Sequence, residues 1–104
     1  MEPSIYTIDF ETTGIDSKTC EPVEVALFGI GSDTVFEFES FIKPSIAIPP
    51  ETSAVHHITD EDVERAASWE IVRTGLRGML TVPEGSRLPV LVAHNAEYEQ
   101  GVLL

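Results

Sequence analysis

Residues 5–14 constrain the chain most, because an apolar run there ends in two carboxylates and then breaks at Gly14. In a β-strand, successive side chains point to opposite faces, so Asp9 and Glu11 share one face while Phe10 points to the other. Two like charges side by side raise the cost of ionising each other. A hard divalent cation would remove that cost, because it binds carboxylate oxygens and keeps positions open for water and phosphate. The alternative is a solvated acidic strand end, and the motif alone does not decide, since 18 of the 104 residues are Asp or Glu.

Length and composition indicate one domain in a reducing compartment. The chain has 104 residues, of which 42% are hydrophobic and 23% charged, so it can bury one core, and we expect a single domain over residues 1–104. Its single cysteine, Cys20, allows no internal disulfide and favours a cytoplasmic location. No apolar run approaches the roughly 18 residues of a membrane span, so we expect no membrane partner.

The net charge of -12 limits how the chain could bind nucleic acid. Such a charge repels nucleic acid unless metal ions or a local basic patch intervene. This argues against a protein that grips a long stretch of DNA. It is compatible with an enzyme that takes one strand end through bound metal.

Two further strands are expected directly after the first. Residues 23–31 are apolar and partly alternating, which predicts a mostly buried strand. Residues 34–42 alternate almost strictly, with Phe36 and Phe38 on one face and glutamates on the other, which predicts a half-exposed antiparallel strand. Short turns join these strands to the first. The chain therefore opens with a three-stranded antiparallel meander.

Helices are expected in the middle of the chain. Residues 51–58 suit a short helix or helical turn, and Thr59 is a plausible N-cap for the acidic turn that follows it. Ser68 is expected to be the N-cap of a longer helix over residues 69–80. An apolar stripe is predicted on one face of that helix. It comprises Trp69, Ile71, Val72, Leu76, Met79 and Leu80.

The end of the chain is expected to return to the first strand. Residues 88–93 form an apolar run without alternation, which is typical of a strand covered on both faces. Because it follows a helix, we expect it to pair parallel to the first strand. Asn95 is a good N-cap for a last helix, and Glu99 on that helix could add a third carboxylate to Asp9 and Glu11. The alternative for Glu99 is a charge that complements the helix dipole.

Four motifs in order and in register resemble the DnaQ-like DEDDh 3′ to 5′ exonucleases, with the exonuclease X type as the nearest match. The motifs are Asp9-Phe10-Glu11-Thr12-Thr13-Gly14, Val23-Glu24-Val25-Ala26, Ala54-Val55-His56-His57-Ile58-Thr59 and Val92-Ala93-His94-Asn95-Ala96. The resemblance implies an α/β, ribonuclease H-like fold, in which the meander and a parallel fourth strand form a mixed sheet with flanking helices. It also implies phosphodiester hydrolysis by two Mg²⁺ or Mn²⁺ ions at the 3′ end of a nucleic acid, with single-stranded DNA as the expected substrate.

The resemblance also implies roles for individual residues. Asp9, Glu11 and Glu99 would be the catalytic, metal-binding carboxylates. The substrate-binding residues would be Thr12, Thr13, Val55, His56, His57, His94 and Asn95. For the two histidines of the middle motif, packing and hydrogen bonding in the turn is the alternative to contact with substrate or to action as a general base.

Two departures from the family pattern leave a second function open. Glu99 stands where the family has aspartate, and the extra methylene moves its oxygens. The family's third motif, a histidine base followed by a last aspartate, comes after a further strand and helix, and this sequence stops at Leu104. The resemblance therefore implies an open sheet edge, which a second copy or a protein partner would cover. The alternative function is a non-catalytic relative that binds a nucleotide, a metal or a protein through its acidic surface.

Overall fold

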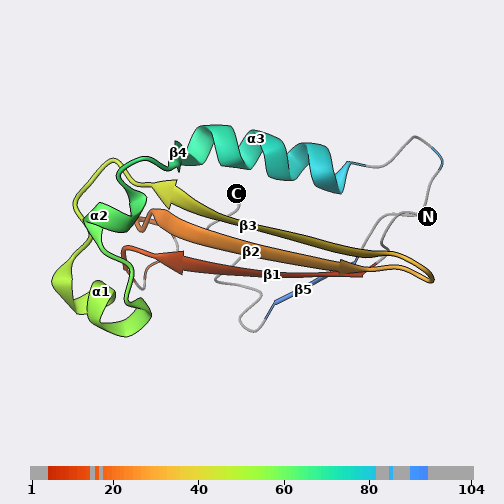
Figure 1. Cartoon of the computed structure of the whole chain (residues 1–104), viewed down its shortest axis with the longest axis horizontal. Coiled ribbons are helices and arrows are strands. Elements are labelled where there is room, and N and C mark those ends of the chain that lie inside the picture. Colours follow the sequence, from red (N-terminus) through yellow and green to blue (C-terminus); the bar gives the residue numbers. More distant parts are fainter. Residues whose placement is uncertain (1–4, 15, 17, 82–84, 86–89, 94–104) are drawn as a thin grey trace.

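The computed structural model describes residues 5–14, 16, 18–81, 85 and 90–93, and these form a mixed five-stranded sheet with a helix along one face (Figure 1). The strand order is β4-β3-β2-β1-β5. β1 is antiparallel to β2, and β2 to β3, whereas β5 is parallel to β1 and β4 to β3. The expected meander and parallel fourth strand are confirmed, and the short β4 is an addition. The strands span Ile5–Thr12 (β1), Pro22–Ile30 (β2), Val35–Lys43 (β3), Ala67–Ser68 (β4) and Val90–Val92 (β5).

In the described part of the chain, three helices follow the meander, and two of them, α2 and α3, begin where the capping residues predict. They are α1 (Pro50–His56), α2 (Asp60–Val63) and α3 (Trp69–Leu80). Thr59 opens α2 with a capping box, because its hydroxyl accepts from the Asp62 amide and the Asp62 carboxylate accepts from the Thr59 amide. Ser68 caps α3 through the Ile71 amide, at 3.4 Å. Among the described residues, no helix is long and apolar enough to cross a membrane.

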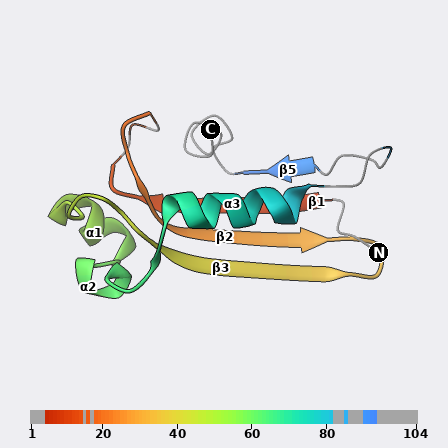
Figure 2. The same ribbon diagram turned by 90° about the horizontal axis from the view of Figure 1, so that it is seen from above.

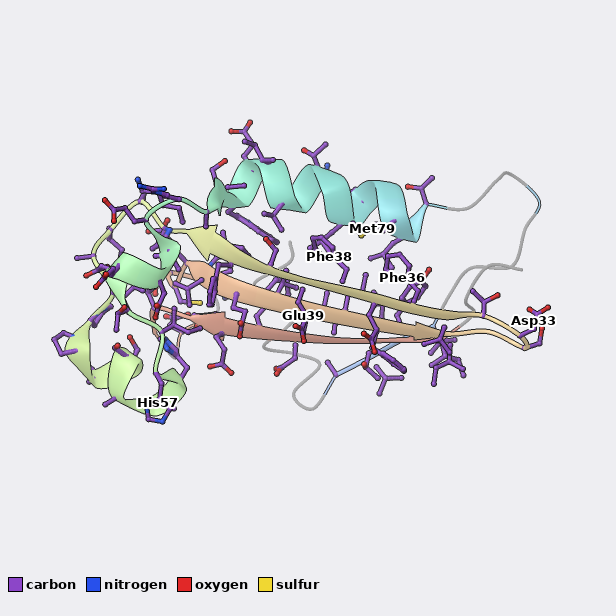
Figure 3. The ribbon with its side chains drawn as sticks, viewed as in Figure 1. Asp33, Phe36, Phe38, Glu39, His57 and Met79 are labelled. Atoms are coloured by element: carbon purple, nitrogen blue, oxygen red, sulfur yellow. The ribbon has the colours of Figure 1, made fainter. Side chains whose placement is uncertain are left out.

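The main core lies between α3 and the sheet. α3 runs along one face of the sheet, and Phe36, Phe38 and Met79 lie on that side, whereas Glu39 points to the other (Figures 2 and 3). The Trp69 ring packs edge-on against the Phe10 ring of β1, with centroids 5.6 Å apart. As far as the described residues go, the sheet therefore has one covered face and one open face. The buried residues of this core are Tyr6, Ile8, Phe10, Val25, Leu27, Ile42, Val72 and Leu76.

A second, smaller core holds α2 and the segments on either side of α1 at the carboxyl end of β1. It consists of Val23, Ile48, Ile58 and Val63, all at most 6% exposed. The connector before α1 is fixed by the Ile48 amide, which donates to the Asp60 carboxylate at 2.8 Å. These contacts place the turn after α1 beside the end of β1.

The prediction that Ile71 belongs to the apolar stripe of α3 is wrong. Val72 and Leu76 are buried and Trp69, Met79 and Leu80 pack against the core, but Ile71 is 65% exposed. A helix turns about 100° per residue, so Ile71 points well away from Leu76, five positions later. The spacing itself excludes Ile71 from the stripe.

The prediction that the last strand is covered on both faces is also wrong. Val90, Leu91 and Val92 are 57, 43 and 47% exposed. β5 stands at the end of the strand order, next to β1 alone among the described strands. A short apolar run has the same composition at an edge as in the middle of a sheet, so the sequence did not distinguish the two.

Candidate active site

The two carboxylates of β1 lie on the open face of the sheet. Along β1, Tyr6, Ile8 and Phe10 are buried, and the intervening Asp9 is exposed and Glu11 half-buried. The predicted alternation is therefore confirmed. Asp9 lines two shallow hollows of this face, of about 370 and 460 Å³. The first is lined by Thr7, Asp9, Ala26, Leu27, Phe28, Glu37 and Glu39, and the second by Thr7, Ile8, Asp9, Val92 and Ala93.

A third carboxylate, that of Glu24, stands beside this pair. Glu24 on β2 is the direct cross-strand partner of Glu11, so both side chains rise from the same face. Burial raises the pKa of Glu24, the negative charges of Glu11, Glu39 and Asp9 raise it further, and His56 lowers it. Negative charge is thus crowded at this end of the open face, and a bound cation would relieve that crowding.

Sequence reasoning gave Glu24 no role in the site. Its signal was present, because Glu24 is the single charged residue in the otherwise apolar β2. Its partner in the sheet depends on the pairing register of two strands, which the sequence of either strand alone does not specify.

Thr12 and Thr13 shape the backbone directly after the carboxylates. They are 7 and 5% exposed. The Thr12 hydroxyl donates to the Gly14 carbonyl at 2.6 Å. Thr13 binds Glu21 twice, since its amide donates to the Glu21 carbonyl and its hydroxyl accepts from the Glu21 amide, both at 2.9 Å. These bonds close the loop between β1 and β2, and the contact of both threonines with a nucleotide stays a prediction.

The turn after α1 is joined to the same strand end. Val55 is 78% exposed, and His57 is exposed in the left-handed region, with φ 63° (Figure 3). His56 points back into the protein, where one ring nitrogen binds the Ile58 amide at 3.0 Å and the other the Thr12 carbonyl at 3.1 Å. Both nitrogens of His56 are therefore engaged within the protein, as a hydrogen-bonding role in the turn requires.

The structure brings together only part of the predicted site. Asp9, Glu11, Thr12, Thr13 and the turn with Val55, His56 and His57 gather at one end of the sheet. His94, Asn95 and Glu99 lie outside the described residues. Within the described ranges, no group of three or more His, Cys, Asp or Glu side chains is arranged to hold a metal ion. The described site therefore supplies two family carboxylates and their neighbour Glu24.

Comparison with known proteins connects this arrangement to nucleases. Residues 7–99 match the exonuclease family RNase_T. The chain is 35% identical to the PolC-type DNA polymerase III of Thermotoga maritima over 99 residues, which cover 94% of the chain and 7% of the polymerase. It is 36% identical over 99 residues to an exonuclease of Escherichia phage 186, covering 95% of the chain and 46% of that protein.

A solved structure supports the same relationship. Exonuclease X in complex with 5′ overhanging duplex DNA is similar to the chain, with 27% identity and a TM-score of 0.73. The similarity covers 96% of this chain and 54% of that one. The chain therefore spans well under two thirds of each of these relatives.

Proposed function

The chain belongs to the DnaQ-like exonuclease family, with its ribonuclease H-like fold, and from that membership we propose that it hydrolyses phosphodiester bonds at the 3′ end of a nucleic acid. The observation that carries the proposal is the placement of Asp9 and Glu11 on the open face of β1. The turn with Val55 and His57, tied to the same strand end, provides an exposed wall beside them.

A divalent cation, Mg²⁺ or Mn²⁺, fits the residues present. Asp9 and Glu11 offer hard carboxylate oxygens on an accessible face, and burial, together with the charges of Glu11, Glu39 and Asp9, raises the pKa of the neighbouring Glu24. We propose Asp9, Glu11 and Glu99 as the residues that hold the metal. The cation supplies charge neutralisation at the phosphate and an activated water. The residues of the chain would hold the cation and the 3′ end of the nucleic acid in place.

Single-stranded DNA is the substrate that the electrostatics favour. With a net charge of -12 and an acidic open face, the chain is poorly suited to contact many phosphates of a duplex. One terminal nucleotide requires few contacts, which we assign to Thr12, Thr13, Val55, His57, His94 and Asn95. His56 belongs to the same substrate-binding turn, and its ring nitrogens are engaged within the protein. We also propose a cytoplasmic location, because the single Cys20 allows no internal disulfide.

The test is hydrolysis of 3′-labelled single-stranded DNA in the presence of Mg²⁺ or Mn²⁺. Asp9→Ala should lower the rate by about 100-fold or more, because it removes a metal ligand. The matched control is Asp33→Ala, which makes the same chemical change at the β2–β3 hairpin, at the other end of the sheet (Figure 3). It should leave the rate within about twofold of the wild type.

Two outcomes would contradict the proposal that the chain is a nuclease. One is no hydrolysis by the wild type with either metal, and the other is an equal loss in the two variants. Metal or nucleotide binding without hydrolysis would identify the chain as a non-catalytic relative that binds through its acidic face.

We also propose that a second copy of the chain covers the β5 edge of the sheet and the adjoining end of the open face. At the end of the open face remote from α1, four apolar side chains stand in register across β3, β2, β1 and β5. We call them the apolar row, and they are 49 to 67% exposed. Exposed apolar clusters of this kind are typical of interaction surfaces. The apolar row consists of Ile5, Ile30, Val35 and Val90.

A further inference from the structure

The ring of His56 connects the turn after α1 to the end of the strand that carries the carboxylates. Its Nδ1 accepts a hydrogen bond from the Ile58 amide at 3.0 Å. A nitrogen that accepts carries no proton, so the neutral ring holds its proton on Nε2. Nε2 lies 3.1 Å from the Thr12 carbonyl oxygen and donates to it. The Ile58 contact therefore fixes the tautomer, and that tautomer supplies the donor for Thr12.

The Thr12 carbonyl lies where the regular pairing of β1 with β2 ends. Thr12 is 7% exposed, and its partner on β2 is Pro22, next to a shift in register. Proline has no amide hydrogen, so Pro22 cannot donate to the strand opposite. The His56 ring supplies a donor to this carbonyl from a residue 44 positions away in sequence.

Both ends of the connection are firmly held. Ile58 is 5% exposed and packs in the second core with Val23 and Val63. Thr12 directly follows Glu11 on β1. α1 itself buries no residue, so core packing does not fix its last turn. The His56 ring is thus a direct link between the turn and the backbone of the carboxylate strand.

We propose that His56 is a positioning residue, which holds the exposed wall of Val55 and His57 at a fixed distance from Asp9 and Glu11. This inference rests on the proposed function, because the wall and the carboxylates would contact the same terminal nucleotide. Active sites lose activity when such groups shift by a fraction of an ångström to an ångström. His56 acts through the Thr12 carbonyl and the Ile58 amide, and not as a general base.

Two amide variants separate the two ring nitrogens. In His56→Gln, the side-chain amide nitrogen can take the place of Nε2 and donate to Thr12. In His56→Asn, the amide oxygen can take the place of Nδ1 and accept from Ile58, but the side chain is too short to reach Thr12. Both variants are neutral and polar. If His56 served only the folding of the turn, the Asn variant would keep more activity. If His56 positions the turn against β1, the Gln variant keeps more activity.

The experiment measures kcat/KM on 3′-labelled single-stranded DNA, the dissociation constant of Mn²⁺, and the ¹⁵N shifts of the His56 ring, all on the full chain. We expect His56→Gln to keep kcat/KM within about threefold of the wild type and His56→Asn to lower it about tenfold. Mn²⁺ binding should change less than twofold in either variant. The ring shifts should report an unprotonated Nδ1 and a protonated Nε2 in the wild type.

The failures of the two proposals can be told apart. If the wild type does not hydrolyse DNA, the proposed function fails, and a ring proton on Nδ1 would separately overturn the His56 connection. If the wild type is active but the two variants lose activity equally, or neither loses it, the positioning role is overturned. If Asn retains more activity than Gln, the role of His56 is confined to the turn.

Discussion

Glu24 carries an electrostatic cost that follows from its place on the sheet. Burial raises its pKa, and Glu11, Glu39 and Asp9 add to the rise. In the unfolded chain the same group has an ordinary pKa. Between the two values, the folded state binds more protons than the unfolded state, so stability falls as pH rises through this window. Above the pKa of the folded state, the full loss of stability caused by the Glu24 charge is present.

Replacing Glu24 by a neutral isostere should therefore stabilise the metal-free protein at neutral pH. Glu24→Gln removes the charge that the fold disfavours, and the gain should be below about 1 kcal/mol, because the side chain is only half-buried and solvent screens it. At pH 4, where Glu24 is largely protonated in both states, the variant and the wild type should be equally stable. Urea unfolding at pH 4, 5.5 and 7 measures this, and a gain that is the same at all three pH values would contradict it.

The sequence predicted the residues of the site whose placement is local. The alternation of Asp9, Phe10 and Glu11 depends on β1 alone, and the two-residue period of a strand was sufficient to predict it. The pairing of Glu24 with Glu11 depends on the register between two strands. The link from His56 to Thr12 joins residues far apart in sequence, so it appears only when the turn is folded against the strand.

Among the secondary-structure elements, α1 owes its end to an unfavourable backbone conformation. His57 terminates it with φ 63° and ψ 15°, and its amide donates to the Ser53 carbonyl at 2.7 Å. This left-handed region favours glycine, because a Cβ crowds the carbonyl there. Since α1 buries no residue, relief of this strain should be visible in stability.

His57→Gly should raise the free energy of unfolding by about 0.5 to 1 kcal/mol, the relief of strain less the added entropy of the unfolded chain. His57→Ala is the matched control, because it removes the imidazole but keeps the Cβ, and it should change stability by less than about 0.5 kcal/mol. Chemical denaturation of the wild type and the two variants measures these changes in the free energy of unfolding. Equal effects of glycine and alanine would show that the ring, not the backbone, determines stability here.

Element boundaries were more predictable than element surroundings. Thr59 and Ser68 marked the starts of α2 and α3, because a cap is a bond between near neighbours. The exposure of Ile71 could have been inferred from the angle between helix positions. The exposure of Val90 could not, because it depends on the absence of a further neighbour for β5 among the described strands.

For the whole molecule, two opposing properties should govern self-association. The apolar row favours contact with a second copy, and the net charge of -12 opposes it. Salt screens the repulsion between like-charged molecules but leaves apolar burial largely intact. Association should therefore strengthen when NaCl is raised, in contrast to an interface held by ion pairs.

The apolar row itself is tested by Ile30→Thr, which keeps a β-branched side chain suited to a strand but removes apolar surface from the centre of the row. We expect it to weaken self-association at least threefold, as measured by sedimentation velocity over a range of protein concentrations in 0.5 M NaCl. Val55→Thr makes a comparable change at an exposed position on α1, outside the row, and should leave association unchanged. A wild type that remains monomeric at every concentration, or an equal effect of the two substitutions, would show that the row is not the surface where two copies meet.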